Sequence, residues 1–325
     1  MTAKDSTQPQ SGAGTVQERS YRMHAEGYQH YVADEAGRKM ADTWFRDDSA
    51  DAWLHLRMFR CIDPVVQEYP ESRWMTVGDG RFGKDAHYLE QKGAKVLATD
   101  ISDKLLAQGR ARGFIQEYQV ENAEALTFAD ESFDFVLCKD AFHHFPRPMI
   151  ALYEMLRVAR QGVLLIEPSD HPVLLAPRGI LFKAIKALAI RCGMGRRFNT
   201  PDTHIIEYND PAYEEGGNFV YGLSEREVEK AAMALNLPHV AFKDLNTFYM
   251  KGAEFEKADE SSAVFRAMQA QIVRRDRRCG RGLNLAAHDI LVALILKAPM
   301  APTLRSSLTA RGYRIRDLPR NPHLQ

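Results

Sequence analysis

The stretch WMTVGDGRFGKDAHYLEQKG, residues 74–93, decides the fold class of this 325-residue chain. It places Gly78, Gly80 and Gly83 in the order G-x-G-x-x-G, directly after a short apolar run and directly before a helical pattern. Glycine has no Cβ, so such a turn can bring backbone N–H groups and a helix N-terminus close to a cofactor. The stretch therefore predicts a strand, a tight turn and a helix that open an α/β cofactor-binding sheet.

Asp100 adds a second signal, because it ends the next apolar run, AKVLATD, 22 residues after Gly78. An acidic side chain at the carboxyl end of the second strand can accept hydrogen bonds from both hydroxyls of a ribose. The alternative role is a helix N-cap, since a helical pattern follows directly. The glycine turn and the acid together predict an adenosine-bearing cofactor, and both NAD and S-adenosylmethionine fit up to this point.

Short apolar runs alternate with helical patterns over the next hundred residues, as they do in βαβ units. This rhythm predicts an α/β fold with a parallel sheet that is covered by helices on both faces. The apolar runs are RWMTV (73–77), AKVLATD (94–100), IQEYQV (115–120), FDFVLC (133–138) and GVLLIEP (162–168).

The flanking segments differ from this core in composition and pattern. Ser224 and Glu227 have the spacing of a helix capping box, and residues 239–250 and 288–298 are predicted strands. The expected parts are a disordered N-terminus (1–20), N-terminal helices (21–72), the cofactor-binding core (73–168), a substrate-lid insertion (169–222), the remainder of the domain (223–298) and a basic C-terminal tail (299–325).

The run ENAEALTFADESFDFVLCKDAFHHF, residues 121–145, separates the two cofactors. With the glycine turn and Asp100, it resembles the class I S-adenosylmethionine-dependent methyltransferases, in particular their small-molecule group. The resemblance covers residues 74–168. It implies a Rossmann-like, seven-stranded, mostly parallel sheet with an antiparallel last strand, and S-adenosyl-L-methionine as the cofactor.

The resemblance also assigns cofactor-binding residues. The turn from Gly78 to Gly80 would hold the methionine and ribose part, and Asp100 the ribose diol. Asn122 stands where the family usually has an aspartate that binds the adenine amino group. The implied cofactor-binding set is Gly78, Asp79, Gly80, Asp100, Ile101, Asn122, Ala123, Lys139 and Asp140.

Two residues depart from the family pattern. Thr76 occupies a position where the family often has an acid that holds the glycine loop or the methionine amino group, and Asp79 or Asp140 is the expected substitute. Phe82 occupies a position where many members have glycine or another small residue. The neutral Thr76 is expected to affect cofactor affinity, and Phe82 is expected to affect the shape of the turn.

His143, His144 and Glu167 are the candidate catalytic residues. Imidazole titrates near neutral pH, and both histidines follow the strand whose carboxyl end should face the reacting methyl group. Glu167 ends the fifth predicted strand, so its side chain should reach the mouth of the site. The structural alternatives are a histidine that fixes its loop and a glutamate that caps the next element.

The predicted insertion supplies the candidate substrate residues His171, His204, Tyr208 and Tyr221, a polar and aromatic set suited to a substrate cover. His204 and Glu207 have a spacing known from metal sites, but no third ligand lies near them. The sequence therefore predicts no metal site.

The bulk composition limits the partners. Forty-three basic residues balance 43 acidic ones, and no apolar run reaches the length of a membrane span. The four cysteines contain no C-x-x-C pair, which fits reduced thiols in a cytoplasmic protein. An arginine cluster at residues 274–282 has no accompanying stacking module, so nucleic acid is not an expected partner.

The leading prediction is transfer of a methyl group from S-adenosylmethionine to an oxygen or nitrogen of a small metabolite or saccharide. The alternatives are an NAD-dependent oxidoreductase, which the glycine spacing allows, and a catalytically silent scaffold protein with a methyltransferase fold. The sequence leaves open the acceptor, the general base and whether the chain forms an oligomer.

Overall fold

A computed structural model describes residues 15–170, 213–279 and 288–324 of the chain. Its centre is an eight-stranded sheet with the order β3-β2-β1-β4-β5-β7-β6-β8. The strands from β3 to β5 are parallel, and β7 runs antiparallel to both of its neighbours. The strands are β1 (Arg73–Val77), β2 (Lys95–Asp100), β3 (Tyr118–Val120), β4 (Phe133–Lys139), β5 (Ala159–Pro168), β6 (His239–Leu245), β7 (Ile290–Leu296) and β8 (Arg314–Asp317).

The mostly parallel α/β sheet and its antiparallel strand β7 confirm the predicted fold class, but the predicted strand number was one too low. The extra strand, β8, pairs antiparallel with β6 and comes from the segment predicted to be a basic tail. That segment contains a helix, α12 (Pro302–Ala310), before β8. The segment was predicted to be a basic tail because its few apolar residues are widely spaced and its arginines dominate the sequence.

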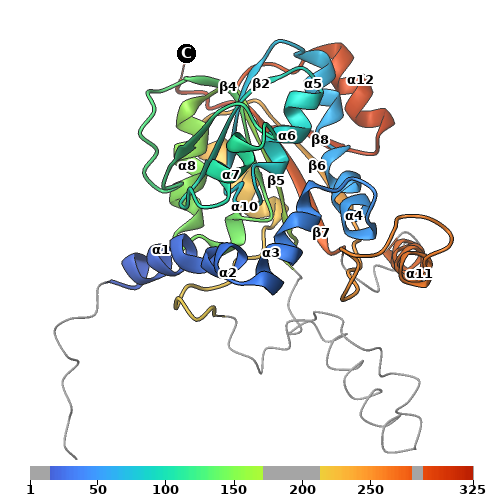
Figure 1. Cartoon of the computed structure of the whole chain (residues 1–325). Helices are drawn as coiled ribbons and strands as arrows, with labels where there is room; N and C mark the ends of the chain where they lie inside the picture. The colour runs from blue at the N-terminus through green and yellow to red at the C-terminus, as the bar shows by residue number, and fades with distance from the viewer. Residues whose placement is uncertain (1–14, 171–212, 280–287, 325) are drawn as a thin grey trace, which may run out of the picture.

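Helices cover both faces of the sheet (Figure 1). Neighbouring strand residues point to opposite faces: Trp74 belongs to one apolar core and Met75 to the other. Burial on both sides explains why the strands read as continuous apolar runs. One core includes α5 (Asp63–Glu68), α6 (Lys84–Gln91), α7 (Leu106–Ala111) and α12, and the other includes α8 (Pro148–Val158) and α10 (Glu225–Ala234).

Three N-terminal helices lie together across one end of the sheet (Figure 1): α1 (Val16–Gly27), α2 (Gln29–Ala33) and α3 (Glu35–Asp42). The Tyr21 hydroxyl fastens α1 to the core by donating to a carboxylate oxygen of Glu124 at 2.6 Å. Thr15 caps α1, so residues 16–20 are helical, which corrects the expectation of a disordered N-terminus over 1–20. Residues 1–14 lie outside the described part of the chain.

Two further helices join the N-terminal region to the second half of the chain. Leu54 of α4 (Ala50–Phe59) and Phe265 of α11 (Ala263–Cys279) belong to one small apolar cluster. The predicted capping box before α10 is present, because Ser224 and Glu227 bond each other's backbone N–H groups. Helix α11 runs to Cys279, so the arginine cluster predicted at residues 274–282 begins inside this helix.

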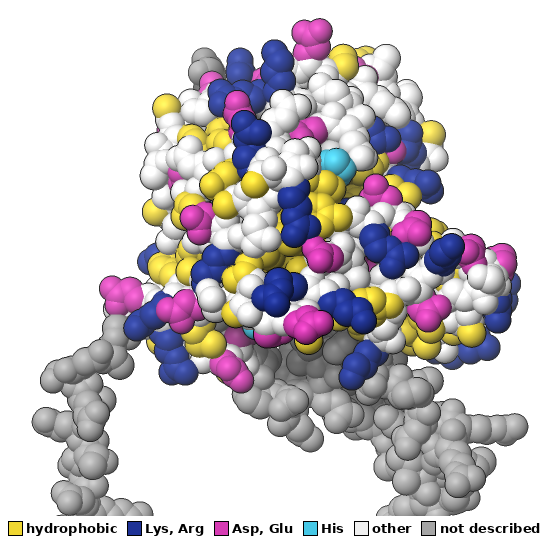
Figure 2. Space-filling model, viewed as in Figure 1, with side chains coloured by type: hydrophobic (Ala, Val, Ile, Leu, Met, Phe, Trp, Pro, Cys, Tyr) yellow, Lys and Arg dark blue, Asp and Glu magenta, His cyan; other side chains and the backbone are white. Residues whose placement is uncertain are grey.

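The molecular surface carries charges of both signs. On the face shown in Figure 2, Lys and Arg side chains alternate with Asp and Glu side chains over the whole view. This mixture agrees with the net charge of zero and gives that face no extended field of one sign. Within the described residues, no helix combines the length and apolar character needed to cross a membrane.

Candidate active site

The glycine turn joins β1 to α6, and the close approach of other elements explains two of its glycines. Gly78 has a positive φ of 75°, and a Cβ there would collide with the side chain of Ala141 after β4. A Cβ on Gly80 would collide with the phenol ring of Tyr28, which reaches down from the N-terminal helices. The turn is therefore covered by an aromatic side chain that the sequence pattern did not indicate.

Phe82 shows why the family pattern has a small residue at its position. Its φ is 59°, a left-handed conformation that glycine adopts without steric cost. The ring is nonetheless buried and packs 4.3 Å from the ring of Phe45. Gly83 also has a positive φ, and a Cβ at this position would lie only 2.6 Å from the side chain of Ile115. The turn keeps its shape, and aromatic packing stabilises the unusual residue.

Asp79 compensates for the neutral Thr76. Its carboxylate accepts hydrogen bonds from the Thr76 hydroxyl at 2.8 Å, the Asp85 N–H at 3.0 Å and the Ala86 N–H at 2.8 Å. Burial, followed by the charge of Asp85, raises the pKa of Asp79 well above its ordinary value. Asp79 thus fixes the first turn of α6 to the glycine loop, which is the first of the two tasks expected of an acid at position 76.

A cavity of about 350 Å³ opens where the parallel strands end. The N-terminal helices form its other wall, with Tyr21, His24, Tyr28 and Tyr31 among the lining residues. Six of the nine predicted cofactor-binding residues line this cavity: Gly78, Asp100, Ile101, Asn122, Ala123 and Asp140. Parallel strands bring these residues together because their carboxyl ends meet at one edge of the sheet.

Asp100 and Asn122 are preorganised by local hydrogen bonds. Asp100 Oδ1 accepts from the Ser102 N–H at 2.8 Å, and burial raises the pKa of Asp100 to about 6. Asn122 Oδ1 accepts from the Glu124 N–H at 3.0 Å, so one lone pair of the predicted adenine acceptor is already used. The second lone pair is the one that an adenine amino group would use.

A second, smaller cavity of about 80 Å³ continues from the first past Gly78 and Asp140. Two of the remaining predicted residues, Asp79 and Lys139, line it. Lys139 Nζ lies 2.9 Å from Asp140 Oδ2 and 3.7 Å from Asp85 Oδ1. Burial alone would raise the pKa of Asp140, but the charge and hydrogen bond of Lys139 hold it well below its ordinary value.

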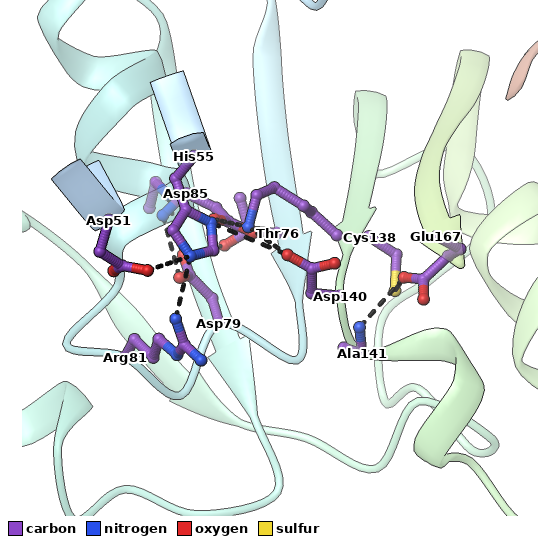
Figure 3. A network of polar contacts seen from close by, with 12 residues as sticks. Asp51, His55, Thr76, Asp79, Arg81, Asp85, Cys138, Asp140, Ala141 and Glu167 are labelled. Carbon is purple, nitrogen blue, oxygen red and sulfur yellow. Dashed lines mark hydrogen bonds and ion pairs between the residues drawn. The ribbon is translucent and has the colours of Figure 1, made fainter. Parts of the chain in front are cut away.

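Side chains from α4 and the glycine loop complete this polar chamber (Figure 3). His55 lies 3.1 Å from an Arg81 guanidinium nitrogen, 3.7 Å from Asp51 and 3.8 Å from Asp140. Burial, with the nearby charges of Lys139 and Arg81, lowers the pKa of His55, so its ring is neutral at physiological pH. Closely spaced carboxylates and cations are suited to a zwitterion, which carries one charge of each sign.

Comparisons with known proteins agree with this geometry. Residues 75–166 match the model of a family described as a methyltransferase domain. These residues form a methyltransferase domain. The match confirms the class I S-adenosylmethionine-dependent resemblance that was drawn from residues 74–168.

Individual relatives of the methyltransferase domain cover only part of either protein. An uncharacterised protein of Mycobacterium tuberculosis is 39% identical over 74 residues, which are 22% of this chain and 27% of the relative. Demethylmenaquinone methyltransferase of Renibacterium salmoninarum is 31% identical over 140 residues, 42% of this chain and 59% of the relative. Phosphoethanolamine N-methyltransferase 2 of Haemonchus contortus, solved with S-adenosyl-L-methionine, is 15% identical, covers 89% of this chain and 61% of that chain, and has a TM-score of 0.49.

The two predicted catalytic histidines of the methyltransferase domain pair with different carboxylates. His143 Nδ1 lies 2.8 Å from Glu167 Oε2. Burial lowers the pKa of His143, but the hydrogen bond and charge of Glu167 outweigh burial and raise it. His144 instead pairs with Glu214 and lines the 350 Å³ cavity.

Glu167 does not reach the mouth of the site, in contrast to the expectation. It is fully buried and accepts hydrogen bonds from the Ala141 N–H at 3.0 Å (Figure 3) and from the Phe142 N–H at 3.1 Å. It therefore holds the 3-10 turn η2 (Phe142–His144) and orients His143, as the capping alternative predicted. Strand position alone did not reveal that η2 folds back over the end of β5.

Of the predicted substrate residues, only Tyr221 lies in the described part of the chain. Its hydroxyl donates to Glu227, and its N–H donates to the His143 carbonyl at 3.2 Å. It supports η2 from behind and is not among the residues that line either cavity. His171, His204 and Tyr208 lie outside the described residues.

Sequence reasoning missed the residues that the N-terminal region contributes to both cavities. Tyr28 and Trp44 line both cavities, and His55 and Asp51 line the smaller one. Arg81, from the glycine loop itself, also lines both cavities and was not predicted. The density of aromatic residues between Tyr21 and Phe45 was the available signal. Nothing in their spacing indicated that they cover the glycine turn rather than pack against one another.

Proposed function

We propose that this chain is an S-adenosylmethionine-dependent methyltransferase that transfers a methyl group to an oxygen or nitrogen of a small metabolite or saccharide. The observation that carries the proposal is the gathering of Gly78, Asp100, Asn122 and Asp140 around one cavity at the ends of neighbouring strands. The methyltransferase-domain match over residues 75–166 supports the same cofactor.

The two cavities suit the two ends of that cofactor. The larger cavity would take adenosine, with the ribose on Asp100 and the adenine between Ile101 and Asn122. The smaller chamber would take the methionine end, because its ammonium and carboxylate groups match the mixed charges of Asp140 and Arg81. The sulfonium would then lie near Gly78, which lines both cavities.

Methyl transfer from a sulfonium is an in-line displacement. An acceptor lone pair forms the new bond to carbon, while the C–S electron pair stays on sulfur. The protein contributes chiefly by holding acceptor and methyl about 3 Å apart and in line. A base is needed only for a protonated acceptor, and imidazole is the side chain that most often acts as a general base. His143 and His144 are the candidates in this chain.

The acceptor would enter from the side of the larger cavity that His24, Tyr31 and His144 line. These side chains combine flat apolar surfaces with hydrogen-bonding groups. Such walls can bind the apolar faces of a small ring while bonding its hydroxyl or amino groups. This chemistry favours a small polar acceptor over an extended polymer.

Calorimetric titration with S-adenosylmethionine, S-adenosylhomocysteine and NAD in one buffer tests the cofactor. Both sulfur compounds should bind with micromolar affinity, and NAD should give no heat of binding. Asp103→Asn is the matched control for Asp100→Asn. Asp103 is exposed, and its substitution removes the same charge three residues away. Binding of NAD alone would refute the proposal.

A screen with S-adenosylmethionine labelled on the methyl group then tests the reaction. Acceptors should include hydroxylated and aminated metabolites, saccharides and demethylmenaquinone, the last because of the 31% identity over 140 residues. Label should appear in an oxygen or nitrogen compound and be lost with Asp100→Asn. Cofactor binding without transfer to any acceptor would favour the silent-scaffold alternative.

A further inference from the structure

Three potential metal ligands from separate parts of the chain meet at the wall of the larger cavity. His24 lies in α1, His144 lies in η2, and Glu214 precedes α10. We propose that they bind a divalent transition-metal ion of the Zn²⁺ type, with open coordination positions that face the cavity. These residues are 120 and 70 positions apart, so their spacing in the sequence gave no sign of a metal site.

The distances fit a single ion after small movements. One ligand atom from each residue lies within 4.8 Å of the other two. His24 Nε2 is 3.1 Å from Glu214 Oε2, and His144 Nδ1 is hydrogen-bonded to Glu214 Oε1. Zinc bonds to nitrogen and oxygen are about 2.0–2.2 Å long, so ligand atoms around one ion lie about 3–3.5 Å apart. Shifts of about 1 Å would bring the three atoms into that range.

His24 gives independent support. Its Nε2 atom is shielded from solvent, and it lies 3.1 Å from Glu214 Oε2 without the orientation of a regular hydrogen bond. A buried polar atom that makes no well-oriented hydrogen bond is unfavourable and calls for an explanation. Coordination of an ion through Nε2 would satisfy this atom.

An outer set of hydrogen bonds holds the carboxylate ligand in place. Asn218 Nδ2 donates to Glu214 Oε2 at 2.9 Å and to the His144 carbonyl at 3.0 Å. The amide oxygen of Asn218 accepts from the Ser20 hydroxyl at 3.1 Å, which connects the network to α1. Metal sites commonly have such outer partners, which orient the ligands and affect metal affinity.

The ligand types indicate the metal and its use. Two imidazoles and one carboxylate favour zinc or a neighbouring transition metal over Mg²⁺ or Ca²⁺, which prefer oxygen ligands. Three protein ligands leave positions for a substrate, as in catalytic zinc sites. His24 and His144 both line the cavity, so those positions are accessible to a bound acceptor.

The role of the ion rests on the proposed methyltransferase function. The ion would bind a hydroxyl oxygen of the acceptor and lower its pKa, so that the proton passes to solvent. The oxygen lone pair then forms the bond to the methyl carbon, and the C–S electron pair remains on sulfur. The substrate class becomes a hydroxyl-bearing acceptor able to coordinate a metal, and His144 is a ligand rather than a base.

Cobalt and zinc titrations of the full-length protein test the site. After dialysis against a chelator, one Co²⁺ per chain should give visible d–d absorption, and calorimetry should show one Zn²⁺ bound with micromolar or tighter affinity. His24→Gln and Glu214→Gln should each weaken binding at least 100-fold, and Asn218→Ala should weaken it about 10- to 100-fold. His323→Gln, at an exposed position near the C-terminus, should leave the affinity unchanged.

Circular dichroism establishes that each variant is folded, and S-adenosylmethionine is titrated into the same wild-type preparation. Absence of a Co²⁺ spectrum and of a Zn²⁺ heat in wild type would overturn the metal site. So would unchanged affinity in both His24→Gln and Glu214→Gln, since the ion would then bind elsewhere. Metal binding without cofactor binding would leave the site standing and remove the proposed function instead.

Discussion

At the residue scale, ionised Asp100 is predicted to lower the stability of the folded protein and to be required for cofactor binding. Burial raises its pKa to about 6, against about 3.9 in an unfolded chain. The folded state therefore binds more protons between these values, so the contribution of Asp100 to stability falls as pH rises from about 4 to 6. Above pH 6 the full penalty applies, and Asp100→Asn should raise the free energy of unfolding by about 3 kcal/mol.

The same ionisation should govern cofactor binding. The ribose hydroxyls need the ionised Asp100, so affinity for S-adenosylmethionine should fall about tenfold per pH unit below about pH 6. Urea unfolding and calorimetry from pH 5 to 8 measure both effects. A flat affinity profile would place the ribose elsewhere.

Gly80 is predicted to be required because of Tyr28. Its φ is one that alanine can adopt, but a methyl group would collide with the Tyr28 ring. Gly80→Ala should therefore weaken cofactor binding at least tenfold and lower the melting temperature. In a Tyr28→Ala background, the same substitution should cost little stability, and the double-mutant cycle measures this coupling. Equal costs in both backgrounds would show that the glycine matters for another reason.

The sequence predicted some residues of the candidate site but not others. Gly78, Asp100 and Asn122 could be predicted because each follows a recognisable strand, and parallel topology brings strand ends together. Tyr28 and Trp44 could not, because their place at the site depends on how the N-terminal helices fold back over the sheet. Backbone periodicity carries no information about that docking.

At the scale of elements, α12 is predicted to be part of the main core rather than an appendage. Leu304 and Leu308 are fully buried in the core that contains α6. Leu304→Ala and Leu308→Ala should each lower the free energy of unfolding by about 2–5 kcal/mol. Ser306→Ala, on the exposed side of the same helix, should change it by less than about 0.5 kcal/mol. Urea unfolding measures all three, and a small effect of both leucine substitutions would contradict the packing.

The strands of the core could be predicted because burial on both faces makes each of them an apolar run. The α12 and β8 segment gave no such run. Its buried residues Leu304 and Leu308 recur at helical spacing within a polar stretch, and β8 is an edge strand with alternating arginines. An edge strand needs few apolar residues because one side of it faces solvent, which is why composition indicated a tail.

At the scale of the whole molecule, the cofactor cavity has walls from two regions far apart in the sequence. The N-terminal helices supply Tyr21, His24 and Tyr28, and the strand ends supply Gly78 and Asp100. A ligand that contacts both walls binds only the folded arrangement, so it must stabilise the protein by mass action. At 100 times its dissociation constant, S-adenosylmethionine should add about 2.7 kcal/mol to the free energy of unfolding.

For a chain of this length, that increment should raise the melting temperature by roughly 5 °C. Thermal unfolding followed at increasing S-adenosylmethionine concentrations measures it, with NAD at the same concentrations as the control. Asp100→Asn should have a higher melting temperature than wild type without ligand and show no further rise with it. If Asp100→Asn melts at a higher temperature than wild type and S-adenosylmethionine raises it no further, the Asp100 carboxylate both destabilises the free protein and binds the cofactor. A ligand-dependent rise in Asp100→Asn equal to that of wild type would instead mean that the cofactor stabilises the protein without using the end of β2.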